Sequence, residues 1–222
     1  MKTEISTILF DLDGTLLDTL ADLQQAVNHA LSCYGYPGKE LEEVRRSVGN
    51  GVAKLIERVL PEGKGNPCFE DCLEKFREYY SAHMQDLTQP YPDIPELLVE
   101  LREHGYRLGI VSNKFDTAVK ELGHNYFEDI IEVAIGESPE VRKKPAPDCV
   151  FEAIRILGSH KESVIYVGDS DVDVETAHNA GLVCVGVTWG FRDRNTLKDA
   201  GADYIIEKPM ELLTLLEEWS KE

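Results

Sequence analysis

Residues 5–15 read Ile-Ser-Thr-Ile-Leu-Phe-Asp-Leu-Asp-Gly-Thr. The first six are mostly apolar and rich in β-branched side chains, which is typical of a short buried strand of a parallel sheet. The strand is expected to end at Asp11, where the polar part of the segment begins. This segment therefore predicts a buried first strand with carboxylates at its carboxyl end.

The chain after this strand changes character over residues 17–87. Apolar side chains recur at helical spacing in three segments, which are residues 20–34, 41–60 and 69–84, and the second is interrupted at Gly49-Asn50-Gly51. We expect no strand between Thr15 and Thr88. The pattern predicts an α-helical domain inserted directly after the first strand.

From residue 91 onward, predicted helices alternate with predicted strands. The strands are expected at 107–111, 164–167, 183–187 and 204–206, and an apolar stretch covers 130–135. The helices are expected at 95–104, after Thr117, at 147–157, at 172–180 and from Met210. Such alternation predicts an α/β fold with a doubly wound, Rossmann-like parallel sheet covered on both faces. The core domain would comprise residues 1–16 and 88–222, and the helical insertion residues 17–87.

The bulk composition narrows the class of protein. A net charge of −18 disfavours a nucleic-acid backbone as partner, and no apolar run approaches the length needed to span a membrane. The five cysteines form no disulfide framework, and the N-terminus does not resemble a signal peptide. We expect a cytoplasmic protein that binds neither nucleic acid nor membrane.

Polar groups follow the predicted strands at one edge of the sheet, where ligands bind in open parallel sheets. They are Asp11-Leu12-Asp13-Gly14, Ser112-Asn113-Lys114, Lys144 and Gly168-Asp169. Two nearby carboxylates repel each other, and a hard divalent cation such as Mg²⁺ removes that conflict. Lys144, Ser112 and the backbone amides after Asp11 could then hold phosphoryl oxygens, as phosphoryl transfer requires.

Two carboxylates two residues apart can divide the chemistry of a displacement at phosphorus. One can attack phosphorus and form a covalent intermediate, while the other protonates the leaving alcohol and later activates water. Asp11 and Asp13 are the candidates for these roles. Trp189 and Phe191 are expected to serve packing.

Four segments of the chain resemble, in order, the four signatures of the haloacid dehalogenase-like hydrolase superfamily. They are Phe-Asp-Leu-Asp-Gly-Thr-Leu at 10–16, Val-Ser-Asn-Lys at 111–114, Lys-Pro-Ala-Pro-Asp at 144–148 and Gly-Asp-Ser-Asp-Val-Asp at 168–173. The resemblance covers nearly the whole chain. It implies a phosphohydrolase that forms an aspartyl-phosphate with the help of Mg²⁺.

The resemblance also implies roles for particular residues. Asp11 would be nucleophile and metal ligand, and Asp13 would be acid/base and offer its backbone carbonyl to the metal. Asp169 would be a metal ligand, and Asp173 would reach the metal indirectly or through water. The expected substrate-binding residues are Gly14, Ser112, Asn113 and Lys144.

The helical insertion resembles the α-helical cap of this superfamily. Gly49-Asn50-Gly51, followed by Leu55 and Arg58, is similar to phosphoglycolate phosphatases. Asn50 is thus expected to contact the substrate, a small phosphorylated metabolite, with phosphoglycolate the first candidate. A phosphosugar mutase, a pyrophosphatase and a catalytically silent interaction protein are the alternatives, and the chain would be a monomer or homodimer.

Overall fold

The computed structural model describes residues 4–139 and 141–221. It divides into two compact units: Met1–Leu16 with Pro90–Glu222, and Leu17–Gln89. Within the described residues, none of the helices combines the length and the apolar character needed to cross a lipid bilayer.

The first unit is built on a six-stranded sheet in the order β5-β4-β1-β6-β7-β8, with every neighbouring pair parallel. The strands are β1 (Thr7–Phe10), β4 (Arg107–Phe115), β5 (Val133–Glu137), β6 (Val164–Gly168), β7 (Val183–Val187) and β8 (Tyr204–Ile206). The prediction of a parallel α/β sheet is confirmed. From β1 the chain adds β4 and β5 on one side and β6, β7 and β8 on the other, so the order switches between β1 and β6. Ligands bind at such a switch point in open parallel sheets.

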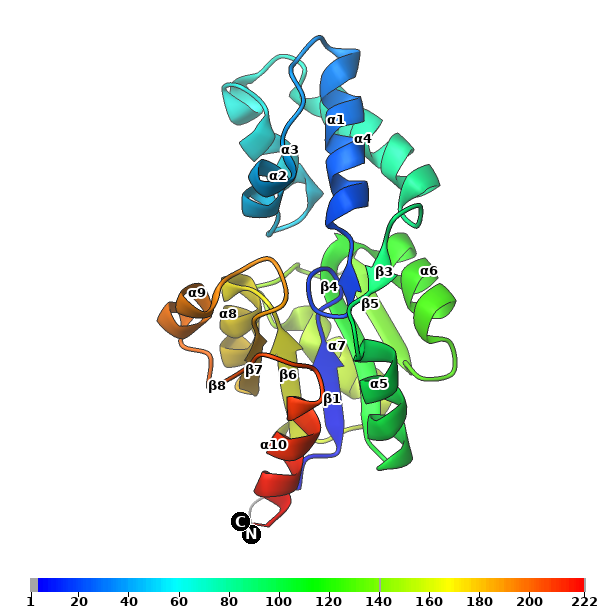
Figure 1. The fold of residues 1–222 in the computed structure, drawn as a ribbon, viewed down its shortest axis with the longest axis vertical. Coiled ribbons are helices and arrows are strands. Elements are labelled where there is room, and N and C mark those ends of the chain that lie inside the picture. The colour runs from blue at the N-terminus through cyan, green and yellow to red at the C-terminus, as the bar shows by residue number, and fades with distance from the viewer. Residues whose placement is uncertain (1–3, 140, 222) are drawn as a thin grey trace. The chain divides into compact units, whose positions relative to one another are not determined.

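Helices cover both faces of this sheet, with α5 and α10 in front and α7 and α8 behind in the view of Figure 1. The helices of the unit are α5 (Ile94–Glu103), α6 (Asp116–Phe127), α7 (Asp148–Leu157), α8 (Asp171–Ala180), α9 (Arg194–Ala200) and α10 (Glu211–Ser220). Leu9 and Tyr166 contribute to the core cluster together with α7 and α8 residues, and both side chains are fully buried. Burial on both faces explains why the strands are apolar runs without alternation.

Two details of the first unit differ from the sequence-based expectation. The strand expected to end at Val111 continues to Phe115, with a register shift against β5 between these residues. The polar side chains of Ser112, Asn113 and Lys114 hid this extension. Helix α9 was not predicted, although Asp193 caps its first turn by accepting from the Thr196 amide.

The second unit is mainly helical, with α1 (Leu20–Cys33), α2 (Leu41–Ser47), α3 (Val52–Val59), a short 3₁₀ turn (Gly63–Gly65) and α4 (Phe69–His83). The expectation of no strand between Thr15 and Thr88 is wrong. The two-residue strand β2 (Leu17–Asp18) pairs with β3 (Gln89–Pro90). Two residues are too few to produce a periodic pattern, so this pairing could not be recognised from periodicity.

Candidate active site

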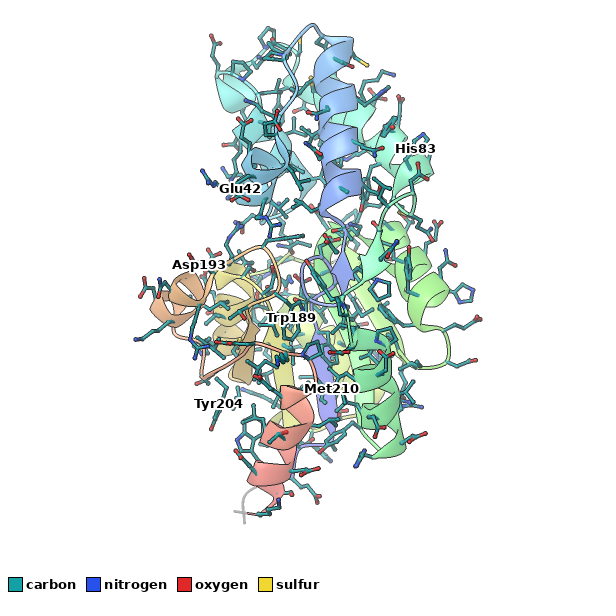
Figure 2. All side chains as sticks on the ribbon, viewed as in Figure 1. Glu42, His83, Trp189, Asp193, Tyr204 and Met210 are labelled. Atoms are coloured by element: carbon teal, nitrogen blue, oxygen red, sulfur yellow. The ribbon has the colours of Figure 1, made fainter. Side chains whose placement is uncertain are left out.

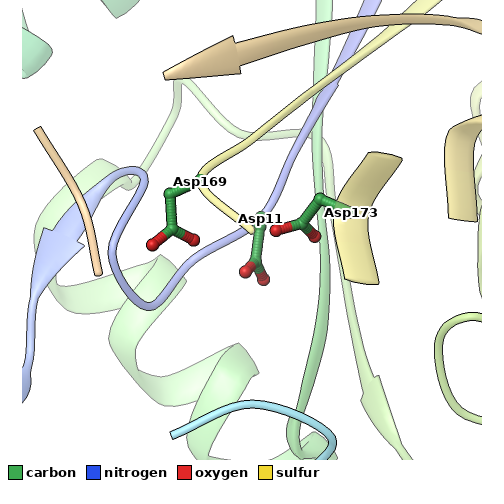
Figure 3. Close-up of side chains that lie close together, drawn as sticks. All are labelled: Asp11, Asp169 and Asp173. Carbon is green, nitrogen blue, oxygen red and sulfur yellow. The ribbon is translucent and has the colours of Figure 1, made fainter. Parts of the chain in front are cut away.

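Three carboxylates lie together at the carboxyl end of the sheet (Figure 3). Asp11 directly follows β1, Asp169 directly follows β6, and Asp173 lies in the first turn of α8. Each offers an oxygen within 4.8 Å of the others, and all three residues are buried. The predicted convergence of Asp11 and Asp169 is thus present, and Asp173 joins them.

Burial makes these negative charges costly. It is the largest cause that raises the pKa of Asp11 to about 7, and the nearby Asp173 adds to the effect. Burial also raises the pKa of Asp169 well above its ordinary value, with further contributions from Asp173 and Asp11. A cation at this position would relieve the repulsion that both shifts express.

Lys144 supplies one positive charge to the cluster. Its Nζ lies 2.7 Å from Asp173 Oδ1 and 2.9 Å from Asp11 Oδ1. Burial works to lower the pKa of Lys144, but the carboxylates of Asp11 and Asp173 hold it well above its ordinary value. Asp11 Oδ1 is buried, and its 2.9 Å contact with Lys144 Nζ is an ion pair. One ammonium against three carboxylates leaves an excess of negative charge.

This donor set fits a hard divalent cation. Carboxylate oxygens are the ligands that Mg²⁺ and Ca²⁺ prefer, and the cluster contains no nitrogen or sulfur ligand among the three groups that converge. The excess of negative charge that remains beside Lys144 is a further indication, since buried carboxylates are costly unless positive charge offsets them.

Asp173 is held in place by donors on both of its oxygens. Oδ2 accepts hydrogen bonds from the backbone amide and hydroxyl of Ser170, which caps α8, and Oδ1 accepts from Lys144 Nζ. A residue that gives both oxygens to protein donors has little left for direct metal ligation. Its contacts place Asp173 as a partner of Lys144.

Two further side chains fix Lys144 in position. Asn113 Nδ2 donates to the Lys144 carbonyl at 2.9 Å, and the Lys144 amide donates to Asn113 Oδ1 at 2.7 Å. Lys144 Nζ also donates to the buried Tyr166 hydroxyl at 3.1 Å, which in turn donates to the Val111 carbonyl. The Asn113 amide thus serves Lys144, and its expected contact with substrate stays a prediction.

The side chain of Asp13 points to a different lysine. Lys114 Nζ lies 2.7 and 3.0 Å from the two oxygens of Asp13, and the Lys114 side chain is only 3% exposed. The extension of β4 beyond Val111 carries Lys114 to this position, next to the buried Ser112. Sequence reasoning missed the roles of Lys114 and Tyr166. The signal for Lys114 was its place beside Ser112 and Asn113.

Gly14 is required by both conformation and space. Its φ of +87° is a left-handed value that side chains disfavour, and a Cβ there would lie 2.4 Å from Asp169 Oδ2. The turn that follows Asp13 therefore passes directly against the Asp169 carboxylate, where its backbone is close to the cluster.

Replacing Lys114 with Met is expected to lower kcat by about 10- to 100-fold, because Asp13 loses the cation that orients both of its oxygens. Steady-state kinetics of phosphate release would measure the change. Lys120→Met is the control, since Lys120 is an exposed lysine paired with Asp116 on α6. Equal kinetics for Lys114→Met and Lys120→Met would contradict the orienting role of Lys114.

Asn50 lies in the second unit, within a loop of unusual backbone. Gly49, Asn50 and Gly51 have φ values of 117°, 64° and 85°, and α3 begins directly afterwards. Arg58 Nη1 closes the loop by donating to the carbonyls of Ser47, Val48 and Gly49. Three consecutive left-handed residues keep these backbone amides out of regular helical hydrogen bonding.

Comparison with known proteins identifies the relatives of this site. Residues 8–187 match the family model described as haloacid dehalogenase-like hydrolase. The chain is 33% identical to a phosphoglycolate phosphatase of Aquifex aeolicus over 95% of its own length and 96% of the relative.

Solved structures give the same picture. A haloacid dehalogenase-like family hydrolase from Streptococcus pneumoniae matches with a TM-score of 0.86 at 28% identity, covering 95% of this chain and 98% of that one. CbbY from Rhodobacter sphaeroides, in complex with phosphate, matches with a TM-score of 0.78 at 28% identity over 94% and 96% of the two chains.

Proposed function

The chain belongs to the haloacid dehalogenase-like hydrolase family and is a phosphoric monoester hydrolase, and we propose that its substrate is the phosphomonoester of a small carboxylate, with phosphoglycolate the first candidate. The observation that carries the phosphoryl-transfer chemistry is the buried group of Asp11, Asp169 and Asp173 around Lys144, and the choice of phosphoglycolate is supported by the relatives of that name. Phosphoryl transfer depends mainly on positioning and on neutralising the charge of the phosphoryl oxygens. Lys144, together with a cation held by the carboxylates, would supply that positive charge.

Mg²⁺ is the cation that we propose for the site. Asp11 and Asp169 would hold it with their carboxylates and Asp13 with its backbone carbonyl. When bound, the ion supplies positive charge to the phosphoryl oxygens and offsets the repulsion between the carboxylates. Asp173, whose two oxygens are bound by Ser170 and Lys144, would act through Lys144.

The two steps of the reaction are assigned to Asp11 and Asp13. A carboxylate oxygen of Asp11 attacks phosphorus, the bond from phosphorus to the ester oxygen breaks, and Asp13 donates a proton to the leaving oxygen. Asp13 then takes a proton from water as that water attacks phosphorus, which releases inorganic phosphate and regenerates the Asp11 carboxylate. Lys144, the Ser112 hydroxyl and the Gly14 amide would hold the phosphoryl oxygens.

Selection of the substrate is assigned to the helical cap, residues 17–87, with residues 1–16 and 88–222 as the catalytic core. A core that recognises only phosphate, a cation and a leaving oxygen does not discriminate among leaving groups, so a second part of the chain must do so. The loop Gly49-Asn50-Gly51, which has left-handed φ values, is proposed to contact the carboxylate of the substrate. If the cap is mobile and closes when the substrate binds, it would also exclude water from the reaction.

A phosphate-release screen tests the proposed substrate. The panel would contain phosphoglycolate, sugar monophosphates, nucleoside monophosphates and pyrophosphate, each with Mg²⁺, and phosphoglycolate is expected to give the highest kcat/KM. Preference for pyrophosphate, or interconversion of sugar phosphates without phosphate release, would establish one of the alternative functions instead. A cytoplasmic location, a monomer or homodimer, and the absence of nucleic-acid and membrane partners stay predictions.

Removal of the metal is expected to abolish turnover, and Ca²⁺ is expected to inhibit it. Ca²⁺ prefers more oxygen ligands at longer distances than Mg²⁺, so Asp11 would be drawn away from in-line attack on phosphorus. Phosphate release in a chelator, with Mg²⁺ and then with Ca²⁺ added back, measures both effects. Full activity in the chelator would contradict the metal assignment.

Replacing Asn50 with Leu is expected to raise KM for phosphoglycolate by about 10-fold or more, because a bulky side chain on this loop would hinder the approach of the substrate carboxylate to the loop backbone, and a lost hydrogen bond to a charged group costs about 1.5–3 kcal/mol. KM for an aryl phosphate without a carboxylate should change much less. Asn50→Gly, which suits the left-handed φ of 64°, is the control for backbone strain. Equal losses on both substrates would mean that the loop is structural.

A further inference from the structure

The loop that follows β7 contacts both halves of the proposed metal site. The indole Nε1 of Trp189 donates to the Thr15 carbonyl at 3.0 Å, and the backbone amide of Phe191 donates to Asp169 Oδ2 at 2.6 Å. Figure 2 labels Trp189 on this loop, in the first unit. Trp189 and Phe191 therefore do more than the packing that the sequence suggested, because the loop ties the turn after Asp13 to the carboxylate after β6.

Gly190 sits at the point of closest approach between these parts. A Cβ at Gly190 would lie 2.2 Å from the Gly14 carbonyl oxygen and 2.4 Å from both Cβ and Oδ2 of Asp169. These distances are far below van der Waals contact, and two of the three atoms are not at the end of a long flexible side chain. Since the φ of Gly190 is not left-handed, space alone requires a glycine here.

The hydrogen bond from the Phe191 amide holds one oxygen of the Asp169 carboxylate, Oδ2. A backbone amide aimed at an ionised oxygen makes a strong, short hydrogen bond that fixes the orientation of the carboxylate. With Oδ2 held, rotation of the carboxylate is restricted and Oδ1 is left for another partner. The Asp169 residue as a whole is only 1% exposed.

We propose that the loop Trp189-Gly190-Phe191 is a positioning element of the metal site, which orients Asp169 by binding its Oδ2 and anchors itself on the Thr15 carbonyl. The loop would set metal affinity without touching the metal, as partners behind metal ligands commonly do. This inference rests on the proposed function, because it assumes that Asp169 binds the cation.

Gly190→Ala tests the loop directly. Calorimetric titration of the metal-free protein with Mg²⁺ is expected to show an affinity weakened by about 10- to 100-fold, because the new methyl group displaces Asp169. Gly123→Ala is the matched control: a Cβ at this buried glycine of α6 would make ordinary contacts of 3.5 and 3.6 Å with Ile110 and Ala134. The thermal midpoint in a chelator separates a general packing defect from a loss of affinity.

Trp189→Phe provides a second variant that keeps Gly190 and an aromatic ring at position 189 but loses the indole donor. Its affinity for Mg²⁺ is expected to fall by about 3- to 10-fold. This is less than the roughly 10- to 100-fold loss that follows when a residue bonded directly to a metal ligand is replaced, because Trp189 bonds to Thr15 and not to Asp169. Trp219→Phe is the control, because Trp219 packs edge-on against Tyr204 and the chain has two tryptophans. The Trp219→Phe protein also retains Trp189 alone, and Mg²⁺ should change its fluorescence.

The outcomes distinguish this inference from the proposed function. If the unaltered protein binds no Mg²⁺ and releases no phosphate, the proposed function itself is wrong. If the unaltered protein binds Mg²⁺, and Trp189→Phe and every folded Gly190→Ala sample bind it equally well, only the role of the loop is overturned. Weakened binding in Trp189→Phe with unchanged binding in Trp219→Phe supports the role even if Gly190→Ala does not fold.

Discussion

Asp11→Asn is expected to lower kcat/KM by more than about 10⁴-fold, as loss of a covalent nucleophile does in other enzymes. An amide oxygen is a far weaker nucleophile than a carboxylate, and the substitution also removes a proposed metal ligand. Asp173 is not placed to take over, since it gives both oxygens to Ser170 and Lys144. Steady-state kinetics with a sensitive phosphate assay would measure the residual rate.

The same substitution should leave the protein folded. Asn removes one of three buried negative charges, and Lys144 keeps its 2.7 Å ion pair with Asp173. Since burial raises the pKa of Asp11 to about 7, its charge is a cost to the metal-free fold, and the thermal midpoint in a chelator should stay the same or rise. A collapse of that midpoint would show that activity was lost through unfolding.

Trapping of a phosphoenzyme tests the nucleophile assignment independently. Acid quenching during turnover of a radiolabelled substrate should leave label on the unaltered protein and none on Asp11→Asn, with the label located at Asp11 by peptide mapping. If label never reaches Asp11 under conditions of rapid turnover, direct attack by water must replace the two-step reaction.

The convergence of the site could be predicted because it follows from the sheet. Buried parallel strands are recognised in a sequence as short apolar runs, and the carboxyl ends of parallel strands lie at the same edge of the sheet. Asp11 and Asp169 follow β1 and β6, two strands that pair in register in the structure. For this reason the sequence located the acidic cluster without any knowledge of side-chain conformations.

The pairing of charges within the site could not be predicted in the same way. Lys114 and Lys144 both stand near strand ends in the sequence, yet Lys114 binds Asp13 whereas Lys144 binds Asp11 and Asp173. This choice depends on the extension of β4 to Phe115, which the polar residues after Val111 concealed. Hydrophobic periodicity indicates which face of a helix or strand is buried. It does not indicate which lysine forms an ion pair with which carboxylate.

The loop Trp189-Gly190-Phe191 shows a second limit of the sequence. The loop contacts Asp169 through the backbone amide of Phe191, and the close approach is possible because Gly190 has no side chain. Neither feature produces a recognisable pattern of residue types in the sequence. Contacts made by the main chain across a long sequence separation become visible only in the folded protein.

Lys144→Met is expected to lower kcat/KM by more than about 10³-fold and to destabilise the metal-free protein by about 3–5 kcal/mol. The activity falls because the phosphoryl oxygens lose a fixed positive charge. The stability falls because Asp11 and Asp173 lose the only ammonium in contact with them that the described structure provides, and uncompensated buried charges are costly.

Thermal unfolding in a chelator and with Mg²⁺ measures the stability effect and separates its causes. Mg²⁺ should stabilise Lys144→Met, because a divalent cation near Asp11 and Asp169 replaces part of the lost charge, but it should not restore activity. Lys143→Met is the control, because Lys143 is the neighbouring lysine with a 42% exposed side chain near Glu137, and its loss should change stability and kinetics little. Equal unfolding temperatures for Lys144→Met and Lys143→Met in the chelator would contradict the stabilising role of Lys144. Protons would then neutralise Asp11 and Asp173 in its place. The phosphate-binding role of Lys144 would in that case rest on the kinetics alone.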